Sequence, residues 1–194
     1  VVHFAGCKAV SESVRDPLKY YRVNVNGSIN VLHAMLETRV NTFIFSSSAT
    51  IYGNTKNNPI SESCHFSPQN PYGQSKRCVE ELLSDIISSS SGINIGRLRY
   101  FNPAGAHPSG NIGENPMGIP NNLFPFITQV LSGKQKSLNV FGDDYNTPDG
   151  TAIRDYIHVS DLADIHLEVA KYLLKKSESN VFNCGYGKGF SVLD

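Results

Sequence analysis

The sequence lacks the features that mark membrane-spanning, secreted and nucleic-acid-binding proteins. Its longest apolar runs are far shorter than the roughly 20 residues that a membrane-spanning helix needs. The start, Val1-Val2-His3-Phe4, has no basic flank of the kind found in signal peptides. Lys and Arg together number 17, as do Asp and Glu, so the formal net charge is zero, and no basic stripe is present. We therefore expect a cytoplasmic protein without a nucleic-acid or membrane partner.

Closely spaced cysteines and histidines are lacking as well. The six histidines are scattered, and the four cysteines lie far apart in the chain, at Cys7, Cys64, Cys78 and Cys184. This spacing does not match the common zinc-site patterns. It favours reduced cysteines that pack as small apolar side chains. We predict no metal site.

The residues that are present indicate a packed α/β protein. Hydrophobic residues make up 40% of the 194 residues, and low-complexity tracts are lacking. Strands that alternate with helices predict a parallel sheet. From apolar patterning, we expect strands at 1–4, 41–45, 94–101, 138–141 and 181–184, and helices at 11–37, 71–87, 122–131 and from 160 onward.

The first expected helix contains a break and an apolar stripe. Asp16-Pro17 interrupts the helical pattern, because the residue before a proline is biased away from helical backbone. After the break, apolar residues recur at helical spacing and predict one buried face. The stripe consists of Val25, Ile29, Leu32, Met35 and Leu36.

A serine-rich segment at a strand end is the most informative stretch of the chain. The strand over 41–45 runs into the serines at 46–48, at the ligand-facing edge of a parallel sheet. A helix then begins at Pro71, which a first turn tolerates. It carries Tyr72 and Lys76 four residues apart on one face. A serine, a tyrosine and a lysine that meet at a strand end indicate proton and hydride chemistry on a hydroxyl or carbonyl group.

The spacing of tyrosine and lysine alone does not identify this pair. The same interval occurs at Tyr52/Lys56, which runs into the turn-rich Asn57-Asn58-Pro59. It also occurs at Tyr172/Lys176, at the basic end of a helix, where cations complement the helix dipole. Only Tyr72/Lys76 follows a hydroxyl-rich strand end. Context therefore selects this pair.

Several other polar residues have two interpretations each. Lys8 is either a solvated loop lysine or a phosphate or ribose contact. Arg154 either pairs with a carboxylate such as Asp155 or binds a diphosphate. The serines at 46–48 either bind a ligand or only satisfy a turn. The loop over 104–122 is long enough to favour a function.

The glycines at 185–189 do not complete a dinucleotide-binding motif. Gly185-Tyr186-Gly187-Lys188-Gly189 has the first glycine spacing of that motif. The motif also requires a glycine three residues after the second one and a helix that leads out. Neither is visible here, so we reject this interpretation.

Several segments together resemble the UDP-glucose 4-epimerase family of extended short-chain dehydrogenases/reductases. The resemblance covers essentially all 194 residues. The tyrosine–lysine pair is shared across that superfamily. The occurrence of the serine-rich segment together with the other segments is more specific to the family. The segments are Phe4-Ala5-Gly6, Ser46 to Gly53, Pro71 to Lys76, Arg99-Tyr100-Phe101-Asn102-Pro103, Gly118 to Leu123 and Gly150 to Ala163.

The resemblance implies roles for individual residues. It implies bound NAD, a UDP-hexose substrate and inversion at C4 of the sugar through a 4-keto intermediate. The implied catalytic residues are Ser48, Thr50, Tyr72 and Lys76. The implied cofactor-binding residues are Phe4, Lys8, Asn24, Tyr72, Lys76 and Tyr100. The implied substrate-binding residues are Ser48, Thr50, Asn102, Asn122, Leu123, Asn139, Phe141 and Arg154.

The resemblance also implies how the chain is organised. Residues 1–102 would form the C-terminal part of an NAD-binding Rossmann domain whose first strands and glycine fingerprint are missing. Residues 103–194 would begin a smaller UDP-sugar-binding region, from which a segment at about 152–184 returns to the Rossmann domain. We expect the chain to be an internal fragment of a larger protein, and the family pattern implies a homodimer. Gln74 departs from the family's usual lysine and should point away from the Tyr72/Lys76 face.

Electrostatics predict how Lys76 would activate Tyr72. An ammonium about 4 Å from a phenol contributes about 4 kcal/mol at an effective dielectric constant near 20. Each unit of pKa corresponds to about 1.4 kcal/mol. We therefore expect Lys76 to lower the pKa of Tyr72 enough for it to act as a base.

Two alternatives remain open beside the epimerase. One is another nucleotide-sugar enzyme, such as a UDP-glucuronate decarboxylase or epimerase. Dehydration is disfavoured, because sugar 4,6-dehydratases generally carry an acidic pair where this chain has Ile51-Tyr52. The other alternative is a non-catalytic protein that keeps the fold. The sequence does not reveal whether N-acetylated sugars are accepted.

Overall fold

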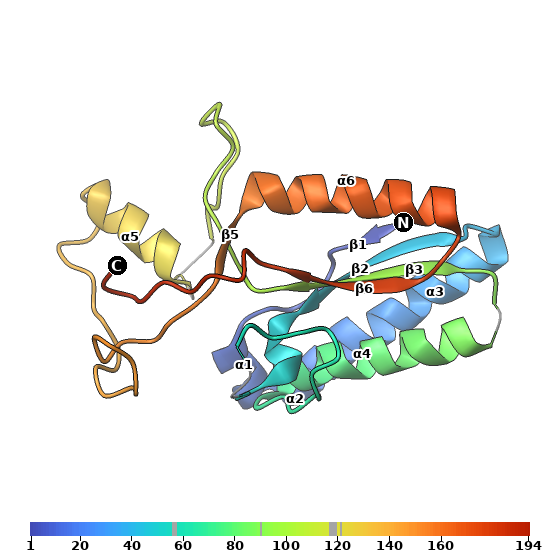
Figure 1. The fold of residues 1–194 in the computed structure, drawn as a ribbon, viewed down its shortest axis with the longest axis horizontal. Helices are drawn as coiled ribbons and strands as arrows, with labels where there is room; N and C mark the ends of the chain where they lie inside the picture. The colour runs from blue at the N-terminus through green and yellow to red at the C-terminus, as the bar shows by residue number, and fades with distance from the viewer. Residues whose placement is uncertain (56–57, 90, 117–119, 121) are drawn as a thin grey trace. The chain divides into compact units, whose positions relative to one another are not determined.

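Four parallel strands form the sheet of the part of the chain that we call the sheet unit, residues 1–101 and 164–184 (Figure 1). Ser48 pairs with Tyr100, and Tyr100 pairs with Cys184, so the three strands that carry these residues end together. The parallel α/β sheet expected from the sequence is confirmed. In sheet order the strands are β1 (Val2–His3), β2 (Thr42–Ser48), β3 (Asn94–Tyr100) and β6 (Asn180–Cys184).

The computed structural model describes residues 1–55, 58–89, 91–116, 120 and 122–194. Residues 102–163 and 185–194 form a second compact unit, which we call the small unit. The domain boundaries that the resemblance implies stay a prediction. The expectation for Tyr52/Lys56 falls partly outside the described residues, because Lys56 is not among them.

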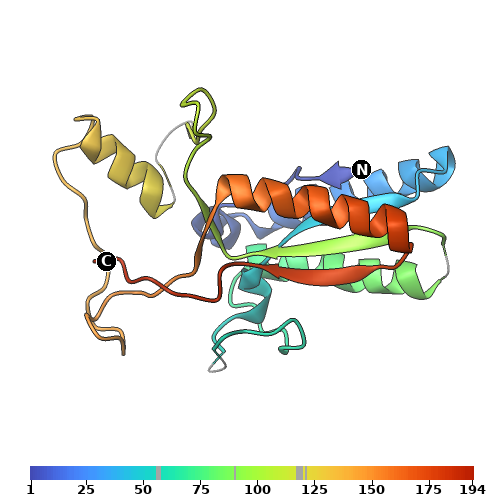
Figure 2. The same ribbon diagram turned by 45° about the horizontal axis from the view of Figure 1, so that its top comes forward.

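Helices cover both faces of the sheet. Figures 1 and 2 show α3 (Gly27–Thr38) and α4 (Pro71–Ser88) on one face and α6 (Val159–Lys176) on the other. On the α6 face, a Cβ atom at Gly96 would lie 2.6 Å from Val169, so the glycine permits the close approach of the helix. On the other face, the buried cluster consists of Leu32, Met35, Phe43, Phe45, Val79, Leu83, Ile93 and Ile95.

Several short helical segments lead into α3. The expected break is confirmed, because the chain leaves helical backbone at Asp16, whose side chain accepts a hydrogen bond from the backbone N–H of Lys19 at 3.1 Å. The expected stripe is wrong at Leu36, which is 45% exposed. The segments are α1 (Val10–Arg15), α2 (Pro17–Tyr20) and the π-helical η1 (Tyr21–Asn26).

The small unit contains a parallel strand pair and a helix. β4 (Asn102–Ala104) pairs with β5 (Tyr156–His158), and α5 (Leu123–Leu131) confirms the expected helix. The strand expected at 138–141 is wrong, since these residues adopt no regular structure. Apolar residues alone do not make a strand, because its backbone groups also need a neighbouring strand to bond. None is paired with 138–141 in the described part of the small unit.

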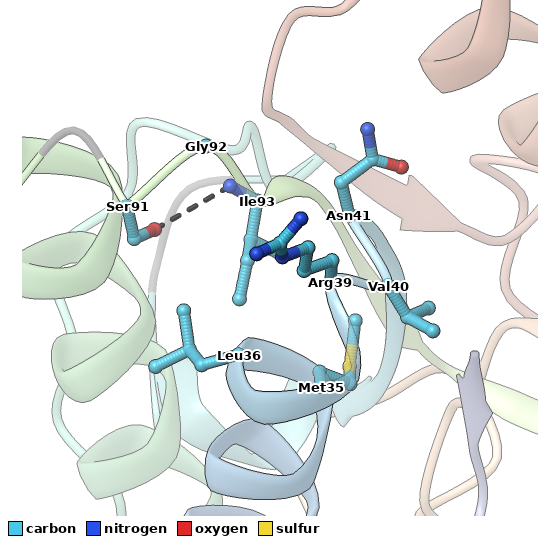
Figure 3. Close-up of a pocket in the computed structure, with 8 residues that line it drawn as sticks. All are labelled: Met35, Leu36, Arg39, Val40, Asn41, Ser91, Gly92 and Ile93. Carbon is cyan, nitrogen blue, oxygen red and sulfur yellow. Dashed lines mark hydrogen bonds between the residues drawn. The ribbon is translucent and has the colours of Figure 1, made fainter.

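A surface hollow lies at the edge of the sheet where β2 and β3 begin. Asn41 directly precedes β2, and Ile93 directly precedes β3 (Figure 3). Because the strands are parallel, Ser48 and Tyr100 lie at the opposite edge. Ligands of open α/β sheets bind outside the carboxyl ends of strands. The hollow is therefore separate from the candidate site described below.

Two kinds of feature are absent from the described residues. None of the helices described by the structure combines the length and apolar character that crossing a membrane requires. Among the same residues, no group of three or more His, Cys, Asp or Glu side chains is arranged to hold a metal ion. The four cysteines are free, with Cys184 buried and the others partly buried.

Candidate active site

Ser48, Thr50 and Tyr72 lie together at the end of β2. β2 stops at Ser48, and a single 3₁₀ turn, η2 (Ala49–Tyr52), follows. The Ser48 Oγ accepts hydrogen bonds from the backbone N–H of Thr50 at 3.3 Å and from the Thr50 hydroxyl at 3.0 Å. The Ser48 hydroxyl is also a hydrogen-bonding neighbour of the Tyr72 phenol and favours its ionised form. The structure thus brings together three of the residues that the sequence selects.

Helix α4 begins directly beside this turn. Pro71 occupies its first turn, and the side chain of Asn70 accepts the backbone N–H of Gly73 at 2.8 Å, which caps the helix. A Cβ atom at Gly73 would lie 3.0 Å from the carbonyl oxygen of Thr50. Glycine therefore lets the helix approach the turn closely. This approach places Tyr72 against Ser48.

Lys76 lies one helical turn after Tyr72, with its ammonium inside the sheet unit. The residue is 6% exposed. Its Nζ donates to the carbonyl oxygen of Ser46 at 2.7 Å and lies 4.9 Å from the centre of the Phe45 ring. Burial lowers the pKa of Lys76 to about 8, because a buried site disfavours the charged form. Lys76 is thus a buried cation held beneath the serine-rich strand end.

The expected acidity of Tyr72 is wrong in this structure. Burial raises the pKa of Tyr72, and the hydrogen bond from Ser48 offsets only part of that rise. An ammonium that faced the phenol would lower its pKa, whereas the Lys76 ammonium donates to the backbone carbonyl of Ser46. Tyr72 alone is therefore a neutral phenol at neutral pH. Activation as a base requires a further positive charge.

The other predicted cofactor residues lie in the sheet unit in different settings. Phe4 is 61% exposed, and its ring centre lies 5.0 Å from that of His166. The Tyr100 hydroxyl lies 2.7 Å from the Nε2 of His166. Burial raises the pKa of Tyr100. Lys8 is exposed.

Asn24 is buried and engaged with the chain itself. Its Oδ1 accepts the backbone N–H of Cys7 at 2.7 Å. Its Nδ2 donates to the carbonyl of Cys7 at 3.1 Å and to the hydroxyl of Ser75 at 2.9 Å. The amide therefore fixes the turn after β1 to α4. A contact with a cofactor stays a prediction for Asn24.

The predicted substrate residues of the small unit are placed on loops and element ends. The side chain of Asn102 donates to the carbonyl of Asp155 at 2.9 Å. Asn122 and Leu123 stand at the start of α5. Asn139 and Phe141 are exposed. How these residues meet a substrate stays a prediction.

Arg154 does not pair with Asp155 in the structure. Its guanidinium donates to the carbonyl of Ile153 at 2.8 Å, and the residue is exposed. The Asp155 carboxylate accepts the backbone N–H groups of Tyr186 at 3.0 Å and Gly187 at 2.7 Å. Of the two interpretations of Arg154, the pairing with Asp155 is therefore wrong. The diphosphate contact stays a prediction.

Sequence reasoning missed two charged residues behind the strand end. Glu80 and Arg99 are 1% and 3% exposed, and they form an ion pair with an N–O distance of 2.6 Å. A signal was present, because Glu80 falls on the apolar face of α4, four residues after Lys76, and Arg99 lies within a buried strand. Charged residues are almost never fully buried without a partner. Their position in the apolar pattern therefore pointed to a pair.

The residues at this edge fit a dinucleotide cofactor. The small residues Ala5 and Gly6 follow β1, and a Cβ atom at Gly6 would lie 3.0 Å from Asn24 and 3.8 Å from the ammonium of Lys76. Glycine here keeps the backbone open for close approach. The Lys76 ammonium has three N–H donors, and Ser46 takes one of them. A buried cation beside an open backbone turn suits the hydroxyls of a ribose.

The fold and the site together define a class. A parallel sheet covered by helices on both faces, with serine, tyrosine and lysine at the carboxyl edge, is the arrangement of Rossmann-type, NAD-binding α/β enzymes. The chain belongs to the NAD dependent epimerase/dehydratase family, whose model matches residues 1–185.

Two similar curated proteins are both named UDP-glucose 4-epimerase. It is 52% identical over 194 residues to UDP-glucose 4-epimerase from Mus musculus and 54% identical to that from Yersinia pestis. These matches cover 100% of the chain and 56% and 57% of the two relatives. The chain thus spans little more than half of their length.

A solved structure matches the whole described fold. It is a UDP-glucose-4-epimerase from Stenotrophomonas maltophila with bound NAD and formylated UDP-arabinopyranose. The TM-score is 0.97 at 47% identity, and the match covers 100% of this chain and 57% of that one.

Proposed function

We propose that the full-length protein is a UDP-glucose 4-epimerase, which interconverts UDP-galactose and UDP-glucose. The observation that carries this proposal is the placement of Ser48 and Tyr72 together at the end of β2, with the buried Lys76 one helical turn further on. Relatives named for this activity at 52% and 54% identity support the choice of substrate. The similar structure with bound NAD supports the choice of cofactor.

Bound NAD would supply reversible hydride transfer at C4 of the sugar, and inversion would proceed through a 4-keto sugar. Lys76 would bind the ribose of the nicotinamide nucleoside. The remaining contacts with the cofactor would come from Phe4, Lys8, Asn24, Tyr72 and Tyr100. The UDP-hexose would be held by Ser48, Thr50, Asn102, Asn122, Leu123, Asn139, Phe141 and Arg154.

The chain's own residues would move the proton of the sugar's 4-hydroxyl. Tyr72 would accept this proton, directly or through Ser48, and would later return it. The hydrogen bond from Ser48 favours the phenolate, whereas burial opposes it. A cationic ring beside Tyr72 would supply the positive charge that the site needs to overcome burial. Thr50, bonded to Ser48, would fix the direction of the serine hydroxyl.

Substitution of Tyr72 tests the proposal. Full-length protein incubated with UDP-galactose is expected to form UDP-glucose. Tyr72→Phe should lower kcat by roughly 10²–10⁴-fold, because the variant loses the proton-transfer group while keeping the ring. Tyr172→Phe is the matched control, since Tyr172 shares the spacing to a lysine but lies near the end of α6. Normal turnover by Tyr72→Phe would disprove the proposed role.

We further propose a cytoplasmic homodimer without nucleic-acid or membrane partners. The zero net charge supports the absence of a polyanionic partner. Family resemblance supports the dimer, with the long helices from Pro17 and Tyr72 as the candidate interface. Sedimentation of the full-length protein at twice its monomer mass is the expected result.

A further inference from the structure

A buried ion pair lies behind the strand end that carries Ser48. The Arg99 Nε lies 2.9 and 3.2 Å from the two carboxylate oxygens of Glu80, and Nη2 lies 2.6 Å from one of them. The two residues are 3% and 1% exposed. Burying two charges has a large desolvation cost, and apolar pairs of similar volume are often as stable or more so. Stability alone is therefore a weak reason for this pair.

The pair connects to the elements that hold the candidate site. The Ser47 hydroxyl, next to Ser48 in β2, donates to Glu80 at 2.5 Å. The Arg99 Nη1 donates to the hydroxyl of Tyr52, the last residue of η2, at 2.7 Å. Glu80 itself lies on α4, the helix that carries Tyr72 and Lys76. One carboxylate and one guanidinium thus tie together β2, β3, η2 and α4.

The connection extends beyond these elements. The Arg99 Nη1 also donates to the carbonyl of Glu62 at 2.8 Å, in the loop between η2 and α4. The Tyr52 hydroxyl donates to the Oδ1 of Asn183 on β6 at 2.6 Å. The Arg99 guanidinium lies 5.2 Å from the ring centre of Tyr52 and 4.8 Å from that of Phe66. Both the turn before α4 and the loop that leads to it are therefore held against the sheet.

We propose that Glu80, Arg99 and Ser47 are positioning residues that fix Ser48 relative to Tyr72. This inference rests on the proposed function, because it concerns the geometry of the proposed proton transfer. The network reaches Ser48 through its neighbour Ser47, and it reaches the turn after Ser48 through Tyr52. It reaches Tyr72 through α4. Hydrogen-bonded networks in a low dielectric are rigid when all their members are satisfied.

Ser47→Ala is the sharpest test, because it removes one link and leaves the ion pair intact. In the full-length protein, kcat for UDP-galactose is expected to fall roughly tenfold to a hundredfold, since small misplacements of reacting groups have effects of this size. KM should stay within about twofold, because a lost transition-state contact lowers kcat without weakening substrate binding. Glu80→Gln should have the same effect or a larger one. Glu81→Gln, on the same helix with its carboxylate at the surface, is the matched control and should behave as wild type.

A double variant separates positioning from a general structural role. If Ser47 acts through Ser48 and Tyr72, Ser47→Ala should cost little further activity in a Tyr72→Phe background. A purely structural role would give the same loss of activity in both backgrounds. If Glu80→Gln does not fold, Ser47→Ala and the double variant still test the positioning role.

Four results would count against the inference, in two different ways. Wild-type kcat in Ser47→Ala, or a full additional loss in the double variant, would overturn the positioning role while wild type remains an epimerase. Failure of wild type to convert UDP-galactose, or full activity of Tyr72→Phe, would overturn the proposed function and this inference together. Wild-type activity and the Tyr72→Phe control therefore tell the two failures apart.

Discussion

The ammonium of Lys76 is buried in the sheet unit, where its pKa is lowered to about 8 from 10.5. Each unit of pKa corresponds to about 1.4 kcal/mol, so this burial opposes folding by roughly 3 kcal/mol at neutral pH. The hydrogen bond to Ser46 returns about 1 kcal/mol. A residue that costs stability is retained where function needs it. Lys76 is therefore expected to serve the chemistry and not the fold.

Replacement of Lys76 by methionine should stabilise the protein and inactivate it. With nucleotide removed from the full-length protein, Lys76→Met is expected to raise the free energy of unfolding at pH 7 by about 2 kcal/mol. Chemical denaturation measures this change, and the UDP-galactose assay should show a loss of epimerase activity. Lys171→Met is the control, because Lys171 is exposed and pairs with Glu168 at the surface. It should change neither quantity.

The pH dependence of this difference identifies its cause. Below about pH 8, both the folded and the unfolded chain keep the proton of Lys76, and the burial penalty is fully present. Between about 8 and 10.5 the folded protein releases the proton and the unfolded chain does not, so wild type gains stability as pH rises. The advantage of Lys76→Met should therefore shrink over this range. An advantage that stays constant with pH would show that burial of charge is not its origin.

At the scale of elements, the turn η2 depends on the glycine that ends it. Gly53 has φ 64° and ψ −142°. These angles lie close to the region of backbone conformation that essentially only glycine adopts. A Cβ atom there would lie 1.8 Å from the carbonyl oxygen of Ser67. This oxygen belongs to the backbone, so it cannot rotate away from the added Cβ as a side-chain atom could. The loop before α4 therefore packs on the turn only because residue 53 has no side chain.

Gly53→Ala should displace that loop and with it the start of α4. We expect the free energy of unfolding to fall by about 3 kcal/mol or more, since both backbone strain and a collision are introduced. Gly92→Ala is the matched control, with φ 79° and nothing within 4 Å of the added Cβ, and should cost only about 1 kcal/mol. Denaturation measures both changes in the free energy of unfolding. Equal losses for the two substitutions would show that the collision with Ser67 does not contribute.

Local signals allowed much of the sheet unit to be predicted from the sequence. Pro71 marked the start of α4, and Asp16-Pro17 marked a break, because proline acts on its own neighbours. The apolar run before the serines predicted β2, although the strand continues to Ser48. These features depend on residues close together in the chain.

Several features that depend on distant residues were not predicted. The apolar run at 138–141 lacks a strand partner in the described small unit, which sequence periodicity does not reveal. The pKa of Tyr72 depends on how completely the packed sheet unit buries it. The direction of the Lys76 ammonium depends on the carbonyl of Ser46, thirty residues away in the chain. Pattern and spacing identified the right residues, but their electrostatics required the fold.

At the scale of the whole molecule, the two units contribute different parts of the proposed reaction. The proposed catalytic residues lie in the sheet unit, whereas most proposed contacts with the UDP-sugar come from the small unit. The chain spans 56% of the length of its mouse relative, and the proposed activity is therefore one of the full-length protein. The substrate assay separates the two enzyme classes that sequence left open.

An isomerase and a UDP-glucuronate decarboxylase make opposite predictions for that assay. An isomerase lowers the barrier equally in both directions, so full-length protein should reach one ratio of UDP-glucose to UDP-galactose from either starting sugar. UDP-glucuronate should give no carbon dioxide. The product ratio, followed by chromatography until it is constant, measures the first expectation, and gas release measures the second. Conversion of UDP-glucuronate without interconversion of the two hexoses would replace the epimerase with the uronate enzyme, and Tyr72→Phe would then test the same site in that reaction.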